Sequence, residues 1–154
     1  MKGIPDGMSA VTPRLYCRDP AAEIEFCKIA FGATELGRRS DSDGNVLHAL
    51  VTIGPAHLMI ESESASLTSR APQSDGSSPV VLYVYVEDVD KTVERAVTAG
   101  AKILFAVANQ FWGDRMGWVM DSEGHVWTVA TRLEETTAEE RDERWSAIKA
   151  KSSS

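Results

Sequence analysis

The sequence has few of the features that mark secreted, membrane-bound or disulfide-stabilised proteins. Its 154 residues include only two cysteines, Cys17 and Cys27, too few for a disulfide framework, and we expect two reduced, buried thiols. No apolar run approaches the ~18 residues of a membrane-spanning helix. Residues 1–10 contain no apolar segment of signal-peptide length. These absences predict a cytoplasmic protein with no membrane partner.

Positive charge is also scarce. Lys and Arg number 16 against 23 Asp and Glu, which gives a net charge of −7. A nucleic-acid surface needs clustered Lys and Arg to neutralise phosphates, and anionic lipid also attracts basic segments. The charge balance therefore predicts no nucleic-acid partner. The hydrophobic fraction of 43% and the charged fraction of 25% are those of a globular protein, and the length suits one domain over residues 1–154.

One pattern of elements occurs twice along the chain. Each unit is predicted to contain a strand, a helix and three further strands, over residues 11–62 in module one and 80–131 in module two. Three pairs of landmarks repeat at a spacing of 68 to 70 residues: Asp19 with Asp88, Gly32 with Gly100, and Gly54 with Gly124. Such a constant spacing indicates two homologous units. One unit exposes a whole sheet face, so two must pair to bury it.

The segments outside the two modules have a different composition. Residues 63–79 are rich in Ser and poor in apolar residues, which predicts a mobile linker. Thr137 and Glu140 form a capping-box pattern that opens a predicted helix over residues 137–149. We expect this helix either to dock on its own domain or to contact a partner.

Four short stretches resemble a known family. Residues 110–115 (QFWGDR) and 121–127 (DSEGHVW) are similar to the second-unit signature of the PhnB-like branch of the glyoxalase/bleomycin-resistance/dioxygenase (vicinal oxygen chelate) superfamily. Residues 30–33 (AFGA) and 84–88 (VYVED) fit the same branch. The resemblance implies an α+β fold in which two βαβββ modules form a paired half-barrel with a central cleft. It also implies a homodimer, with the cleft completed either within one chain or across the pair.

The resemblance also locates the positions at which metal-using members bind their ion. In those members four side chains, usually His, Gln or Glu, point into the cleft from four strands. Carried over one at a time, these positions fall near Thr12, Glu61, Val81 and Thr128. A divalent ion needs several converging N and O donors, and only Glu61 supplies one. We therefore predict no bound metal and no cofactor.

His48 and Glu61 are the candidates for proton transfer. A tight turn at Gly54-Pro55 pairs Ile53 with Ala56, and the same register places His48 directly opposite Glu61. A His–Glu pair in a cleft can perform acid–base chemistry. The alternative is an ordinary polar cross-strand pair.

The cleft is predicted to be an apolar pocket with a few orienting polar groups. Alternation along each strand turns one face into the cleft, and it turns Trp127 away, under a helix. Trp112 with Arg115 suits a planar or anionic small molecule near the mouth; alternatively, Trp112 fills the barrel or the subunit seam. The predicted ligand-binding residues are Glu61, His48, Tyr83, Tyr85, Trp112, Arg115 and Thr128.

Three functions are consistent with these patterns. The first is a metal-independent protein that binds a small-molecule ligand, with or without catalysis. The second is a metal-dependent lyase, isomerase or dioxygenase of the same superfamily, which the missing metal donors disfavour. The third is a structural or partner-binding domain, which a well-formed apolar cleft would disfavour.

Overall fold

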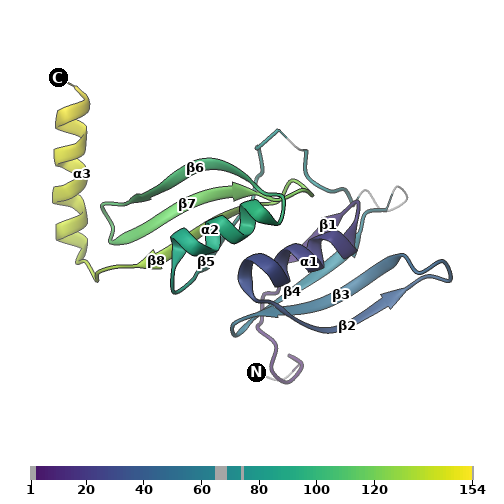
Figure 1. Ribbon diagram of the computed structural model, residues 1–154. Coiled ribbons are helices and arrows are strands. Elements are labelled where there is room, and N and C mark those ends of the chain that lie inside the picture. The colour runs from purple at the N-terminus through teal and green to yellow at the C-terminus, as the bar shows by residue number, and fades with distance from the viewer. Residues whose placement is uncertain (1–2, 65–68, 74, 154) are drawn as a thin grey trace.

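The chain forms two sheets that stand side by side. The structure is a computed structural model and describes residues 3–64, 69–73 and 75–153. Within these residues there are two four-stranded sheets and three helices (Figure 1). The predicted linker over residues 63–79 includes positions 65–68 and 74, which lie outside the described residues.

The two sheets have the same topology. The first module contains β1 (Arg14–Cys17), α1 (Pro20–Phe31), β2 (Thr34–Ser40), β3 (Val46–Ile53) and β4 (Ala56–Ser62). The second contains β5 (Val81–Tyr85), α2 (Val89–Thr98), β6 (Lys102–Asn109), β7 (Asp114–Met120) and β8 (Val126–Arg132). The strand orders are β1-β4-β3-β2 and β5-β8-β7-β6, with the first pair of each sheet parallel and the others antiparallel. The predicted βαβββ repeat is confirmed.

Local sequence signals define the ends of the helices. The carboxylate of Asp19 accepts the N–H of Ala22 at 3.2 Å, Pro20 occupies the first turn, and Gly32 ends α1 in the left-handed conformation with φ of 66°. Asp88 caps α2 in the same way through the N–H of Lys91 at 3.1 Å. The helix boundaries therefore follow from capping residues that can be recognised in the sequence.

The β3–β4 hairpin has the predicted register. Ile53 pairs with Ala56 and His48 pairs with Glu61. Strand β1 begins at Arg14, later than the expected residue 11. Pro13 has no N–H to donate and cannot extend a ladder on both sides, although its carbonyl still accepts the N–H of Met59 at 2.9 Å.

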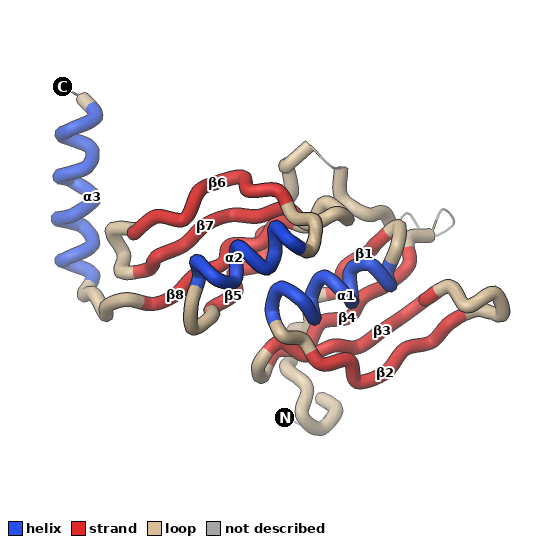
Figure 2. The backbone as a smooth tube through the Cα atoms, viewed as in Figure 1, coloured by secondary structure: helices blue, strands red, loops and turns tan. Residues whose placement is uncertain are grey.

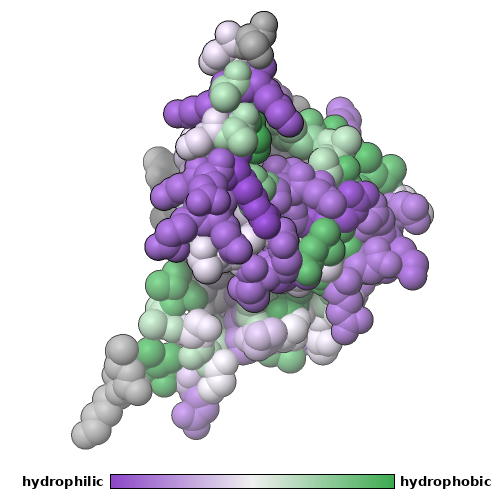
Figure 3. Space-filling model, turned by 90° about the vertical axis from the view of Figure 1, so that its left-hand side faces the viewer, coloured by the Kyte–Doolittle hydropathy of each residue, from purple (hydrophilic) through white to green (hydrophobic). Residues whose placement is uncertain are grey.

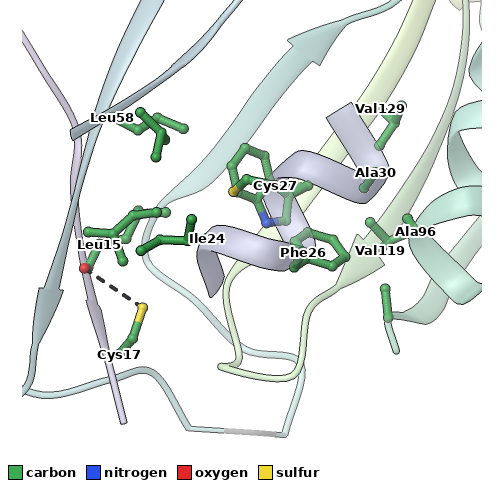
Figure 4. Close-up of a cluster of buried hydrophobic side chains, with 14 of the residues drawn as sticks. Leu15, Cys17, Ile24, Phe26, Cys27, Ala30, Leu58, Ala96, Val119 and Val129 are labelled. Carbon is green, nitrogen blue, oxygen red and sulfur yellow. Dashed lines mark hydrogen bonds between the residues drawn. The ribbon is translucent and has the colours of Figure 1, made fainter. Parts of the chain in front are cut away.

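One hydrophobic core joins the two modules. Helices α1 and α2 lie side by side in front of the strands (Figures 1 and 2) and contact each other. Trp127 of β8 is 2% exposed, and its ring centroid lies 4.7 Å from that of Phe31 on α1. Figure 4 shows the surrounding cluster, in which Cys17 and Cys27 are buried, free thiols. The predicted burial of Trp127 under a helix is confirmed.

The C-terminal helix α3 (Ala138–Ser152) extends away from the sheets (Figure 1). Its capping box at Thr137 and Glu140 is formed, and none of its residues is buried. It contacts the body through its N-terminal half, where Trp145 packs on Phe111 with ring centroids 5.3 Å apart. Figure 3 views this side of the molecule and shows hydrophilic groups across its centre. No helix among the described residues is long and apolar enough to cross a membrane.

Candidate functional site

Each sheet has one face covered by helices and one face turned away from them, which we call the open face. Paired residues share a face, and alternate residues along a strand change face. Ile60 and Trp127 are buried toward the helices. The residues next to them along β4 and β8 therefore belong to the open faces, as do the residues at every second position and their partners on the adjacent strands. On the first sheet these are Arg14, Tyr16, His48 and Glu61; on the second they are Tyr83, Tyr85, Asp114, Trp118, Thr128 and Arg132.

A charged cluster occupies the open face of the first sheet. His48 Nδ1 lies 2.6 Å from Glu61 Oε1, and Arg14 Nε lies 3.7 Å from the same oxygen. Both His48 and Glu61 are half-buried. The contact uses Nδ1, so Nε2 is the ring nitrogen that can exchange a proton with a ligand. The arrangement can therefore orient a polar group or transfer a proton.

The second open face carries a cluster built around Asp114, whose side chain is completely covered. Its Oδ2 accepts hydrogen bonds from Tyr83 Oη at 2.5 Å, Trp112 Nε1 at 2.9 Å and Tyr85 Oη at 3.1 Å. The guanidinium of Arg132 approaches from the other side, with Nε 2.7 Å from Oδ1. One buried carboxylate thus fixes three aromatic side chains and one cation.

The electrostatics of this cluster keep Asp114 ionised and Tyr83 protonated. Burial alone would raise the pKa of Asp114, but the hydrogen bonds from Tyr83, Trp112 and Tyr85 and the charge of Arg132 outweigh burial and lower this pKa. Burial and the hydrogen bond to Asp114 raise the pKa of Tyr83. Tyr83 therefore remains a hydrogen-bond donor at neutral pH.

The aromatic side chains held by Asp114 form a partly exposed surface, which we call the aromatic wall (Tyr83, Tyr85 and Trp112). The rings of Tyr83 and Tyr85 are 5.2 Å apart and are 45% and 56% exposed as residues. Arg132 Cζ lies 5.8 Å from the centroid of the Tyr85 ring. Because their polar atoms are tied to Asp114, the rings are held in place while part of their surface faces solvent.

Hollows between the modules border both clusters. Among the described strands, β1 pairs only with β4 and β5 only with β8, so the two strands are the inner edges of their sheets. A cavity of about 410 Å³ is lined by Arg14, Tyr16 and Leu82, and another of about 330 Å³ by Tyr83, Tyr85 and the β3–β4 hairpin. A groove of about 1030 Å³ reaches Tyr85 and Arg132. These volumes are in the range of small-molecule sites.

Most of the predicted site residues lie on the open faces. His48 and Glu61 are together on the first sheet, and Tyr83, Tyr85 and Trp112 are together on the second. Thr128 lies in one row between Tyr83 and Trp118 and is 2% exposed, so its neighbours limit its access to a ligand.

Arg115 does not join this group. Its Nε and Nη2 lie 2.8 Å from the two carboxylate oxygens of Asp90 on α2, and its Nη1 donates to Asn109 at 3.0 Å. Alternation explains the placement, because Arg115 follows Asp114 by one residue in β7 and therefore points to the helix-covered face.

Asp114 and Arg132, which hold the second cluster together, were not among the predicted site residues. The signal was available: counting in twos from Thr128 along β8 gives Arg132, and counting back in twos from Trp118 along β7 gives Asp114, its partner in the ladder. The strand was predicted to begin at Arg115, and β7 in fact begins at Asp114. A one-residue error at the start of the strand thus left the central carboxylate in the preceding loop.

The donors present do not fit a catalytic divalent ion within one chain. Thr12 precedes β1. Glu61 is paired with Tyr16 of β1 and Thr128 with Tyr83 of β5, and neither tyrosine is a usual ligand of such an ion. Glu61 is engaged by His48 and Arg14. Within residues 3–64, 69–73 and 75–153, no group of three or more His, Cys, Asp or Glu side chains is placed to hold a metal ion.

The fold and these faces define a paired βαβββ protein with hollows of small-molecule size between its modules. The chain belongs to the Glyoxalase/Bleomycin resistance protein/Dioxygenase superfamily, whose family profile matches residues 9–129. An uncharacterized protein of Mycobacterium bovis is 37% identical over 134 residues, which cover 85% of this chain and 88% of that protein.

Solved structures show the same fold. TioX from Micromonospora sp. ML1 is 27% identical with a TM-score of 0.64, over 81% of this chain and 99% of TioX. A glyoxalase/bleomycin resistance protein/dioxygenase family enzyme from Burkholderia phytofirmans PsJN is 21% identical with a TM-score of 0.63, over 78% of this chain and 95% of that one.

Metal content provides a direct test of the donor set. We expect protein purified without chelator to contain no stoichiometric Zn, Ni, Mn or Fe, because a single carboxylate cannot hold such an ion. Elemental analysis measures this, and the melting temperature should not change on addition of EDTA. One metal per chain that is lost in Glu61→Gln but retained in Glu25→Gln would contradict the prediction and favour a metal-dependent enzyme.

Proposed function

We propose that the protein binds a small planar organic molecule, without a metal, against the open faces of its two sheets where the modules meet. The observation that carries the proposal is the aromatic wall fixed by buried Asp114. Planar ligands stack on aromatic rings and displace water from them, and rings that are already held in place lose little conformational freedom on binding. The charged cluster of Arg14, His48 and Glu61 supplies polar groups that can orient such a ligand.

Three finer assignments belong to the same proposal. The QFWGDR and DSEGHVW stretches support the PhnB-like branch, and the composition supports a cytoplasmic location. A homodimer is supported by large apolar side chains left exposed on the outer strand β6, Ile103 and Phe105. A second copy would then complete the cleft; light scattering that shows a monomer at micromolar concentration would remove the dimer.

Tryptophan fluorescence tests the ligand site. In titrations with a panel of planar compounds such as acridine, phenazine and naphthoate, binding should change the emission and raise the melting temperature. Trp112→Phe should lose most of the emission change. Tyr85→Leu should weaken binding about fivefold, because a lost aromatic contact is worth roughly 1 kcal/mol.

Trp145→Phe is the matched control, because Trp145 lies on α3 and takes no part in the Asp114 cluster. It should retain both the emission change and the affinity. A signal that survives in Trp112→Phe and disappears in Trp145→Phe would place the ligand at α3 instead. Failure of every compound in the panel to bind would contradict the planar-ligand proposal.

A further inference from the structure

The two modules are joined by a contact between the start of α1 and the turn that connects β7 to β8. Glu123 of this turn accepts the backbone N–H of Arg18 at 2.5 Å and that of Asp19 at 3.2 Å through Oε2. Arg18 Nη1 reaches the carbonyl of Glu123 at 3.4 Å. A carboxylate of the second module therefore binds the chain just before the first helix of the other module.

A second carboxyl group, that of Glu23, lies beneath this contact. Glu23 is on α1 and is 0% exposed. Its Oε1 faces Cys27 Sγ at 3.8 Å, whereas Oε2 has no hydrogen-bond partner among the described residues. A buried, unpaired carboxylate oxygen is costly, so this oxygen requires either a donor or a proton.

Asp121, in the same turn as Glu123, is the acceptor that a protonated Glu23 needs. Asp121 Oδ1 accepts the N–H groups of Glu123 at 3.0 Å and His125 at 2.9 Å, and Oδ2 accepts Trp127 Nε1 at 2.8 Å. Three donors thus already point at the two oxygens of Asp121, so this carboxyl group serves as a hydrogen-bond acceptor. Two facing carboxyl groups in a buried site cannot both be charged at low cost, and the proton therefore belongs on Glu23.

The other titratable groups around Glu23 include no lysine or arginine that could replace that proton. They are Cys17 on β1, Cys27 on α1, and Asp121, Glu123 and His125 in the β7–β8 turn. Burial and the neighbouring carboxylates raise the pKa of both thiols. His125 Nε2 lies 2.9 Å from the carbonyl of Tyr16 and so faces the backbone of β1. Burial, the charge of Asp121 and the hydrogen bond that a proton on Glu23 allows to Asp121 raise the pKa of Glu23 well above its ordinary value.

We propose that Glu23 stays protonated in the folded protein and donates a hydrogen bond to Asp121, which makes the contact between the two modules dependent on pH. The unfolded chain releases this proton near the ordinary Glu value of about 4.3. The stabilisation from this contact is therefore complete below about pH 4.3 and decreases as the pH rises toward the higher folded-state pKa. Within that window the ratio of folded to unfolded protein falls about tenfold per pH unit from this one group.

Denaturant unfolding at several pH values tests the proposal. Between about pH 5 and pH 8, wild-type protein should lose stability, and Glu23→Gln should lose much less, because its amide can donate to Asp121 without titrating. Glu23→Gln should also be the more stable protein at the upper end of the range. Glu25→Gln is the matched control: Glu25 is an exposed residue of the same helix, paired with Lys28, and its variant should keep the wild-type slope.

Infrared spectroscopy gives an independent reading on folded protein. Wild-type protein near neutral pH should show the C=O band of a protonated carboxyl group, and Glu23→Gln should lack it. The proposal is overturned if the band is absent from wild type or if Glu23→Gln keeps the wild-type pH slope. If Glu23→Gln does not fold, the wild-type band and its loss in the apolar variant Glu23→Leu decide the question.

Discussion

Trp127→Ala is expected to lower the free energy of unfolding by about 4 kcal/mol, the cost of truncating a buried tryptophan. Trp127 extends from β8 of the second module to Phe26 and Phe31 of the first, with ring centroids 6.4 and 4.7 Å away. Its indole also donates to Asp121. The variant loses apolar contact, leaves a cavity and removes a donor from a buried carboxylate, and these three losses act in the same direction.

Equilibrium unfolding in urea measures this loss, with Trp145→Ala as the matched control. Trp145 is 46% exposed on α3, and its truncation should cost no more than about 1 kcal/mol. Equal losses in the two variants would show that α3 contributes to the core as strongly as β8 does, which would contradict the packing described above.

Asp114→Ala is expected to cost about 3 kcal/mol, because it removes one partner from a buried ion pair and leaves several donors without their acceptor. Tyr83, Tyr85, Trp112 and Arg132 all converge on this carboxylate. The same variant should also abolish the fluorescence response to planar compounds, since the aromatic wall loses the group that holds it.

The Asp90–Arg115 pair on the opposite face of β7 is a natural control for this experiment. Like the Asp114–Arg132 pair it joins an aspartate to an arginine, but the Asp90 side chain is 52% exposed. Surface ion pairs contribute roughly 0–1 kcal/mol, so Asp90→Ala should be nearly as stable as wild type and should bind ligand normally. If the two substitutions have similar effects, Asp114 is not the organising centre of its cluster.

The parts of the fold that could be predicted are those fixed by local chemistry. Asp19, Asp88 and Gly32 define helix ends because capping depends on the residues beside it. The tight turn at Gly54 fixes the pairing of His48 with Glu61 because a hairpin register follows from its turn. Residue types at a regular spacing were therefore sufficient for the topology.

The rest of the candidate site depends on where each strand begins and on contacts between distant segments. Alternation along β7 turns Asp114 to the open face and Arg115 to the helices, but no capping residue in the sequence marks Asp114 as the first residue of this strand. The approach of Glu23 to Asp121 joins residues 98 positions apart in different modules. Such a contact follows from the packing of α1 against α2 and Trp127 of the second module, which no local pattern encodes.

The separation of the two sheets has a consequence for how ligand preference can change during evolution. Among the described strands, no backbone ladder crosses from one sheet to the other. Each cluster is therefore rigid within its own sheet, while the distance between the clusters depends on side-chain packing around α1, α2 and Trp127. Substitutions in that packing can alter the width of the gap between the modules and leave the residues of both open faces unchanged. Under the proposed function, ligand preference can therefore change through the interior of the protein as well as through the residues of the aromatic wall.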